Sequence, residues 1–93
     1  METKAGNPGA FAHFDLNRVD SPAFVVDAAK IRANCQVLAG IRDEAMSEGA
    51  SIKVFSALKA FSMWSVAPII GEYLDGVCTS GLWEARLASE FYD

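Results

Sequence analysis

Lys59 is the residue of this sequence best placed for covalent chemistry. It stands at the end of an apolar, β-rich run, Ser51–Ala60, and a helix is expected to begin soon after it, near Trp64 or Ser65. Open parallel sheets and closed (β/α) barrels gather their chemistry at the carboxyl ends of strands. A lysine held there in an apolar, partly desolvated pocket can attack a carbonyl carbon and form a Schiff base. Lys59 is therefore our candidate nucleophile, although the residues alone favour a surface lysine whose stem covers apolar neighbours.

The run that carries Lys59 has two faces. On one face lie Ile52, Val54, Ser56 and Leu58, and on the other lie Lys53, Phe55, Ala57 and Lys59. Both faces are largely apolar, which is typical of a parallel strand covered on each side. If Lys59 points into a barrel, the aliphatic residues of the first face lie under the surrounding helices.

Two further strands and three helices are expected around this run. Pro22 can open a short strand that ends at Asp27, and Asp27 can cap the helix that follows. Pro68 is acceptable only in the first turn of the second helix. The expected elements are a strand over Pro22–Asp27, a helix from Ala28 to about Ser47 stopped by Gly49, a helix from Trp64 or Ser65 to Asp75–Gly76, a strand over Val77–Ser80 and a helix over Leu82–Tyr92. In the first helix Cys35 falls on the buried face, whereas Arg32 and Arg42 fall on the solvated face.

The order strand, helix, strand, helix, strand, helix indicates the α/β class. We expect residues 1–20 to be a flexible leader and residues 21–93 to form one domain. A complete (β/α)8 barrel takes about 250 residues, so the pattern predicts the first third of a TIM-type barrel, with one sheet edge unpaired. We therefore expect an incomplete domain.

The amino-acid composition and the net charge argue against some classes of binding partner. The 93 residues are 52% hydrophobic and 22% charged, and the net charge of −4 includes no long run of one sign. This balance argues against nucleic acid or an anionic membrane as the main partner and is compatible with a cationic substrate. Cys35 and Cys78 lack the spacing of a metal site, and neither a secretion signal nor a membrane helix is evident. We expect reduced thiols in a cytoplasmic protein that holds no metal.

Three segments together resemble a known enzyme family. They are Ala57–Val66, Glu72–Gly76 and Ser80–Leu87, and they closely resemble carboxynorspermidine (carboxyspermidine) decarboxylase, a member of the alanine-racemase-like, fold-type III pyridoxal-phosphate enzymes. Pro22–Asp27 also matches the opening strand of that superfamily. Other decarboxylases of this fold type usually carry Lys-x-Asn at the cofactor lysine, whereas this sequence has Phe61 at the asparagine position. The resemblance spans residues 21–93.

This resemblance implies a cofactor and a reaction. Lys59 would hold pyridoxal 5'-phosphate as a Schiff base, and the cofactor ring would store the electron pair left when carbon dioxide departs. The substrate would be a polyamine carboxylate and the product norspermidine or spermidine. The full-length enzyme would be a homodimer, and its phosphate-binding glycine loop and further site residues would lie downstream of residue 93. These 93 residues alone are expected to be inactive.

The third strand departs from the family pattern. Cys78 stands where related amino-acid decarboxylases carry an aspartate, and Gly81 stands where this branch more often has serine. Ser80 is therefore the local candidate for cofactor binding, and a helix-capping role for it stays equally open. Glu84 is expected to support the site or to cap the helix. Trp64 and Trp83 are expected to be packing residues.

Alternative functions remain beside this one. The chain could derive from another fold-type III amino-acid decarboxylase or from a non-catalytic barrel that binds pyridoxal phosphate. A third alternative is an inactive truncated product.

Overall fold

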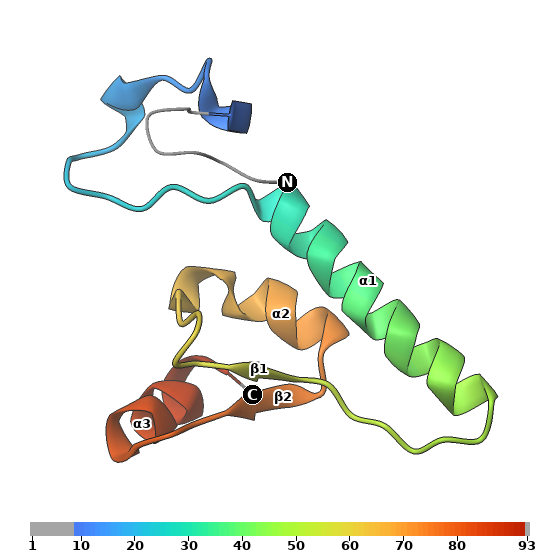
Figure 1. Cartoon of the computed structure of the whole chain (residues 1–93). Coiled ribbons are helices and arrows are strands. Elements are labelled where there is room, and N and C mark those ends of the chain that lie inside the picture. Colours follow the sequence, from blue (N-terminus) through green and yellow to red (C-terminus); the bar gives the residue numbers. More distant parts are fainter. Residues whose placement is uncertain (1–8, 93) are drawn as a thin grey trace.

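The computed structural model describes residues 9–92, and within them two parallel strands and three α-helices follow one another along the chain (Figure 1). Residues 1–8 of the predicted leader lie outside the described residues, as does Asp93. The elements are α1 (Ala28–Ser47), β1 (Phe55–Ala57), α2 (Ala67–Tyr73), β2 (Gly76–Cys78) and α3 (Leu82–Phe91), with 3-10 turns over Gly9–Phe11, Leu16–Arg18 and Trp64–Val66. The predicted α/β class is confirmed at this level.

The sheet consists of β1 and β2. They pair in parallel, and the register places Phe55 opposite Gly76 and Ala57 opposite Cys78. The backbone nitrogen of Leu58 donates to the carbonyl oxygen of Cys78 at 3.1 Å, so the strands stay joined one residue beyond β1. Parallel neighbours need a crossover connection, and here α2 supplies it.

Helix α1 has the boundaries that its capping residues predict. The carboxylate of Asp27 accepts hydrogen bonds from the backbone nitrogens of Ala29 at 3.0 Å and Lys30 at 3.4 Å. At the other end Gly49 adopts φ 91°, a left-handed conformation that favours glycine, and donates to the carbonyl oxygen of Met46 at 3.1 Å. The predicted start and stop of this helix are both confirmed.

The predicted starts of α2 and α3 are also close to those observed. The turn Trp64–Val66 leads directly into α2, whose first turn contains Pro68. Because the first amide groups of a helix have no intrahelical partner, proline costs little there. Helix α3 begins at the predicted residue and ends one residue early, at Phe91.

The predicted strand Pro22–Asp27 is wrong. This segment pairs with no strand among the described residues, although Asp27 itself is extended (φ −92°, ψ 107°). A strand is stabilised by ladder hydrogen bonds and by side chains on a neighbouring strand. The segment instead passes beside the loop at 60–65, and Phe24 remains 94% exposed. Without a ladder the β-rich composition gives an extended chain but no strand.

The other two predicted strands are shorter than expected. The predicted run Ser51–Ala60 pairs only over Phe55–Ala57, because Leu58–Ala60 form a turn in which the nitrogen of Ala60 donates to the carbonyl oxygen of Ala57 at 3.0 Å. The strand predicted over Val77–Ser80 runs from Gly76 to Cys78. Three paired residues on each strand therefore carry the whole sheet.

The core lies between α1 and α2. Val66, which immediately precedes α2, is buried in it. The centre of the core is formed by Cys35, Val66 and Ile70, which are 4–6% exposed. Arg32 strengthens the contact between the helices, because its guanidinium lies 2.6 Å from the carboxylate of Glu72 and 3.1 Å from the hydroxyl of Tyr73. The predicted burial of Cys35 is confirmed. Partly buried side chains packed on this centre are Ile31, Phe61, Met63, Ile69, Tyr73, Leu74 and Tyr92.

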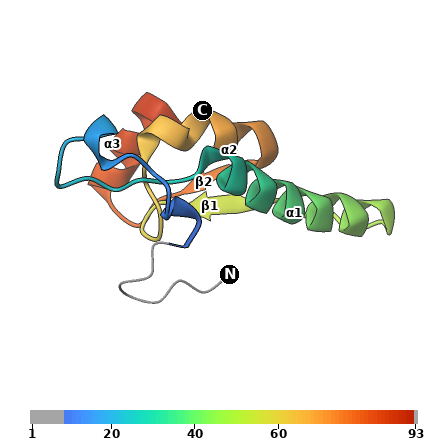
Figure 2. The same ribbon diagram turned by 90° about the horizontal axis from the view of Figure 1, so that it is seen from above.

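The molecule is elongated. The radius of gyration is 15.8 Å, whereas a compact domain of this length has about 12 Å. Figures 1 and 2 show why, since α1 extends well beyond the sheet. No helix in the described part of the chain is long and apolar enough to cross a membrane.

Candidate active site

Lys59 lies in the turn that follows β1 directly. Its neighbour Leu58 is buried, with 2% exposure, whereas Lys59 is exposed. The predicted position at the carboxyl end of a parallel strand is confirmed. The predicted apolar enclosure is not formed by the described residues, because the sheet has only two strands there and no layer of side chains covers the amine.

The residues that share a strand face with Leu58 were expected to lie under the helices, but they differ in how far they are buried. Leu58 is buried and Val54 is half-buried, as predicted. Ile52 is 40% exposed, because it precedes β1 in a segment that no helix covers. Ser56 contacts the same hollow as Cys35 and Ile70 and so faces the helices.

Ser80 and Glu84 are joined across the first turn of α3. The backbone nitrogen of Ser80 donates to Glu84 Oε2 at 2.8 Å. The helix begins after Gly81, which offers no side-chain cap. Glu84 therefore closes this helix end, as the sequence predicted for it, and the hydroxyl of Ser80 makes no hydrogen bond with the described residues. The capping role considered for the Ser80 side chain is not observed.

Lys59 and Ser80 come to the same edge of the sheet. The last pair in the register is Ala57 with Cys78, which are the final residues of β1 and β2. Lys59 lies two residues after the end of β1, and Ser80 lies two residues after the end of β2. Neighbouring strands lie about 4.8 Å apart, and the bond from Leu58 to Cys78 keeps these two together up to the turn. The sheet thus carries an amine and a free hydroxyl at its carboxyl end.

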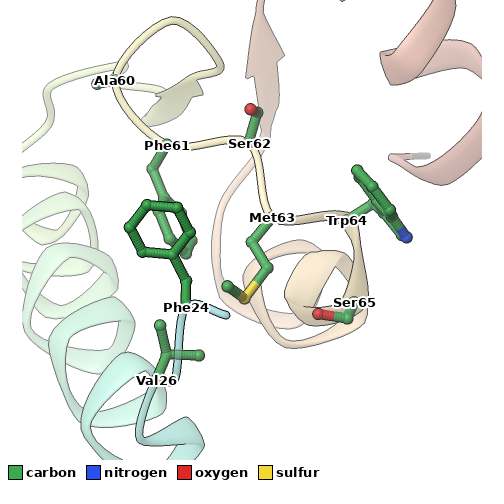
Figure 3. A pocket seen from close by; sticks show the side chains of 8 residues that line it. All are labelled: Phe24, Val26, Ala60, Phe61, Ser62, Met63, Trp64 and Ser65. Atoms are coloured by element: carbon green, nitrogen blue, oxygen red, sulfur yellow. The ribbon is translucent and has the colours of Figure 1, made fainter. Parts of the chain in front are cut away.

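An apolar hollow of about 700 Å³ opens immediately after Lys59. It is lined by Phe24, Val26 and the residues from Ala60 to Ser65. Figure 3 shows the side chains of Phe24, Val26, Phe61 and Met63 converging in this hollow. The turn that carries the amine therefore continues into one wall of the hollow.

The two tryptophans of the site region differ in their contacts. Trp64 stacks on Phe91 with ring centroids 5.8 Å apart, so its predicted packing role is confirmed. Trp83 is 76% exposed, and the guanidinium of Arg86 lies 5.0 Å from its ring centroid. The predicted packing role of Trp83 is not observed, because α3 presents this side chain to solvent.

An ionic clamp lies at the opposite end of the sheet. Asp75 Oδ2 accepts from the backbone nitrogen of Val54 at 2.8 Å and from Arg42 Nη1 at 3.1 Å. The hydrogen bond from Val54, and then that from Arg42, hold the pKa of the Asp75 carboxyl below its usual value. Arg42 was predicted on the solvated face of its helix, yet its side chain is only 18% exposed. The helical spacing could not show that this side chain reaches Asp75.

The cysteines are both free. Cys35 is buried, as predicted for a core residue, and Cys78 is exposed. Burial raises the pKa of the Cys35 thiol. Among the residues that the structure covers, no group of three potential metal-ligating side chains is assembled.

The sequence is similar to those of several known decarboxylases. Over 76 residues the chain is 40% identical to the carboxynorspermidine/carboxyspermidine decarboxylase of Campylobacter jejuni, a match that covers 82% of this chain. The protein of the same name from Herminiimonas arsenicoxydans is 32% identical over 72 residues, or 77% of this chain. The predicted resemblance is confirmed. The carboxyaminopropylagmatine decarboxylase of Synechocystis is also similar, with 35% identity over 75 residues and 81% of this chain.

These matches cover a limited part of the relatives. This chain spans 19% of the Campylobacter decarboxylase and 18% of each of the other two. No protein-family model matches the chain. No solved structure matches it either.

Proposed function

We propose that this chain is the part of a pyridoxal-phosphate-dependent carboxy-lyase that carries the cofactor lysine. The reaction would convert carboxynorspermidine or carboxyspermidine to norspermidine or spermidine in polyamine biosynthesis. The observation that carries the proposal is the 40% identity to a decarboxylase of this name over 82% of the chain. The position of Lys59 at the carboxyl end of β1, on the same edge as Ser80, supports it.

The fold supports the same proposal at a coarser level. The described order of β1, α2, β2 and α3, with parallel pairing, gives two successive strand–helix units, the kind of unit that a (β/α)8 barrel repeats eight times. We propose that these elements belong to such a barrel in a cytoplasmic homodimer. In a closed barrel the exposed face of the sheet at Lys59 would be covered by side chains of other strands, which would enclose the amine.

The side chains at this edge fit one part of a cofactor site. Lys59 has no ion-pair partner among the described residues, and the hydroxyl of Ser80 is equally free. Lys59 Nζ would link covalently to the cofactor aldehyde and Ser80 Oγ would bind one of its polar groups. When bound, the cofactor supplies an electron sink for the pair of electrons left by carbon dioxide.

The chain's own residues have two tasks in this reaction. Lys59 Nζ is the nucleophile, and the described residues leave it without an ion pair at the sheet edge. The net charge of −4 is compatible with a polyamine substrate, because a polycation meets no overall repulsion from these residues. The hollow beside Lys59 has an apolar wall and offers no charge to such a substrate, so we do not assign it to substrate binding.

A chimeric enzyme tests the proposal. The 76 matched residues of the Campylobacter decarboxylase are replaced by their counterparts from this chain, and norspermidine formation from carboxynorspermidine is measured. We expect activity, and we expect Lys59→Ala to reduce it by about a thousandfold because the nucleophile is lost. Lys53→Ala is the matched control and should leave the rate unchanged. A chimera whose activity survives Lys59→Ala would overturn the assignment of Lys59.

A further inference from the structure

We propose that Glu84 is a positioning residue that holds Ser80 at the sheet edge where Lys59 lies. The inference rests on the proposed function, because it assumes that a ligand linked to Lys59 contacts the Ser80 hydroxyl. It adds a role for a side chain that itself does not need to touch that ligand.

The geometry of the β2–α3 connection carries the first step. Between the end of β2 and the start of α3 the chain is fixed by the bond from the nitrogen of Ser80 to Glu84 Oε2, at 2.8 Å. Gly81, between them, is fully extended and contributes no side chain that could hold the connection. A hydrogen bond to an ionised carboxylate is stronger than one between neutral groups. Glu84 is therefore the group that sets the backbone position of Ser80.

The second oxygen of Glu84 supplies an independent observation. Oε1 is shielded from solvent and has no hydrogen-bond partner among the described residues. A buried acceptor without a donor costs free energy. The Ser80 hydrogen bond thus keeps the carboxylate in a position where Oε1 has lost its contact with water, so the carboxylate does not turn fully to solvent.

The third step links this clamp to Lys59. The bond from Leu58 to Cys78, at 3.1 Å, fixes the two chains relative to each other immediately before they diverge. From that point the turn carries Lys59 and the β2–α3 connection carries Ser80. Loss of the Glu84 bond would free the second of these two segments only, so the hydroxyl would leave its position while the amine would stay.

Amide hydrogen exchange in the 93-residue chain tests the clamp directly. We expect Glu84→Ala to speed exchange at the Ser80 amide at least about tenfold, as fits the loss of one charge-assisted hydrogen bond. Glu84→Gln keeps an acceptor oxygen and should restore most of the protection. Glu90→Ala, on an exposed position of α3, is the control and should change nothing. Unchanged exchange at Ser80 in Glu84→Ala would overturn the inference.

Cofactor labelling tests the functional half. The chimeric decarboxylase described above is incubated with pyridoxal 5'-phosphate and reduced with borohydride, and the ratio of label on Lys59 to label on Lys53 is measured by peptide mapping. We expect Ser80→Ala and Glu84→Ala to lower this ratio severalfold, and the double variant to lower it no further, because both changes remove the same contact. Glu84→Gln should recover the ratio, which a general loss of stability would not explain.

The outcomes separate the two proposals. Preferential label on Lys59 that Glu84→Ala leaves unchanged would overturn the positioning role and keep the proposed function. Multiplicative effects of the two single variants would also overturn it, because Glu84 would then not act through Ser80. Equal label on Lys59 and Lys53 would overturn the proposed function together with the inference that rests on it.

Discussion

Arg42 and Asp75 form an ion pair of 3.1 Å that joins α1 to the amino end of β2. The same carboxylate oxygen accepts the backbone nitrogen of Val54, which precedes β1, and Arg42 also donates to the carbonyl oxygen of Tyr73 at 3.0 Å. One carboxylate therefore connects a helix with the entrance of both strands. Because the sheet has three paired residues on each strand, this clamp is important for holding the strands in register, and so for placing Lys59.

Asp75→Asn should lower the urea concentration at the midpoint of unfolding. The amide has no charge for Arg42 and accepts the Val54 hydrogen bond less strongly. Asp43→Asn is a matched control, since Asp43 also pairs with Arg42, at 3.0 Å, but is 66% exposed and holds no strand. Circular dichroism during urea titration measures both variants. Equal shifts for the two would show that the backbone contact of Asp75 contributes nothing.

Stability should fall in acid in a way that depends on Asp75. Its pKa is lower in the folded chain because Val54 and Arg42 donate to the ionised form. This stabilisation is fully present above the unfolded pKa of about 3.9 and is lost as the pH falls through the lower folded value. Urea midpoints measured from pH 7 down to pH 2 should therefore drop more for the parent chain than for Asp75→Asn. Parallel pH profiles for the two would contradict the coupling.

Leu58→Ala should destabilise the chain by about 2–5 kcal/mol, the usual cost of a cavity at a buried leucine. Leu58 is 2% exposed, and it stands immediately before Lys59. Leu82→Ala is the control, because that leucine is 67% exposed and its removal leaves no cavity. Urea unfolding followed by circular dichroism gives both free energies. Similar losses for the two variants would disprove the assignment of Leu58 to the core.

The two thiols should react at very different rates. Cys78 is exposed, whereas Cys35 is buried and its pKa is raised, so less of it is thiolate at any given pH. Alkylation with a maleimide at pH 7, followed by peptide mapping, should label Cys78 first and Cys35 only after urea is added. Label on Cys35 at the rate of Cys78 would mean that the core between α1 and α2 opens readily.

Much of this architecture follows from local signals. Asp27 and Gly49 bound α1, and Pro68 marks the first turn of α2, because caps and proline act through the backbone of their own segment. The strand at Pro22–Asp27 could not be decided in this way, since a strand exists only where a neighbour supplies the other half of its ladder. The segment has the β-rich composition of a strand, but no neighbouring strand pairs with it among the described residues.

The site shows the same division. The position of Lys59 after β1 follows from the change between a two-residue and a helical period. The exposure of its amine depends on side chains from other strands, which local periodicity cannot place. The contacts of Asp75 with Val54 and Arg42 could not be predicted, because they depend on how segments far apart in the sequence meet. The contact of Glu84 is local, four residues from Ser80, and capping was one of the two roles expected for that carboxylate.

The central claim is that Lys59 is the amine that links to pyridoxal 5'-phosphate. Borohydride reduction of the chimeric decarboxylase in the presence of this cofactor, followed by peptide mapping, tests it most directly. We predict that the reduced cofactor is found on the peptide containing Lys59 in preference to those containing Lys53 and Lys30. Preferential label on either of those lysines would contradict the account.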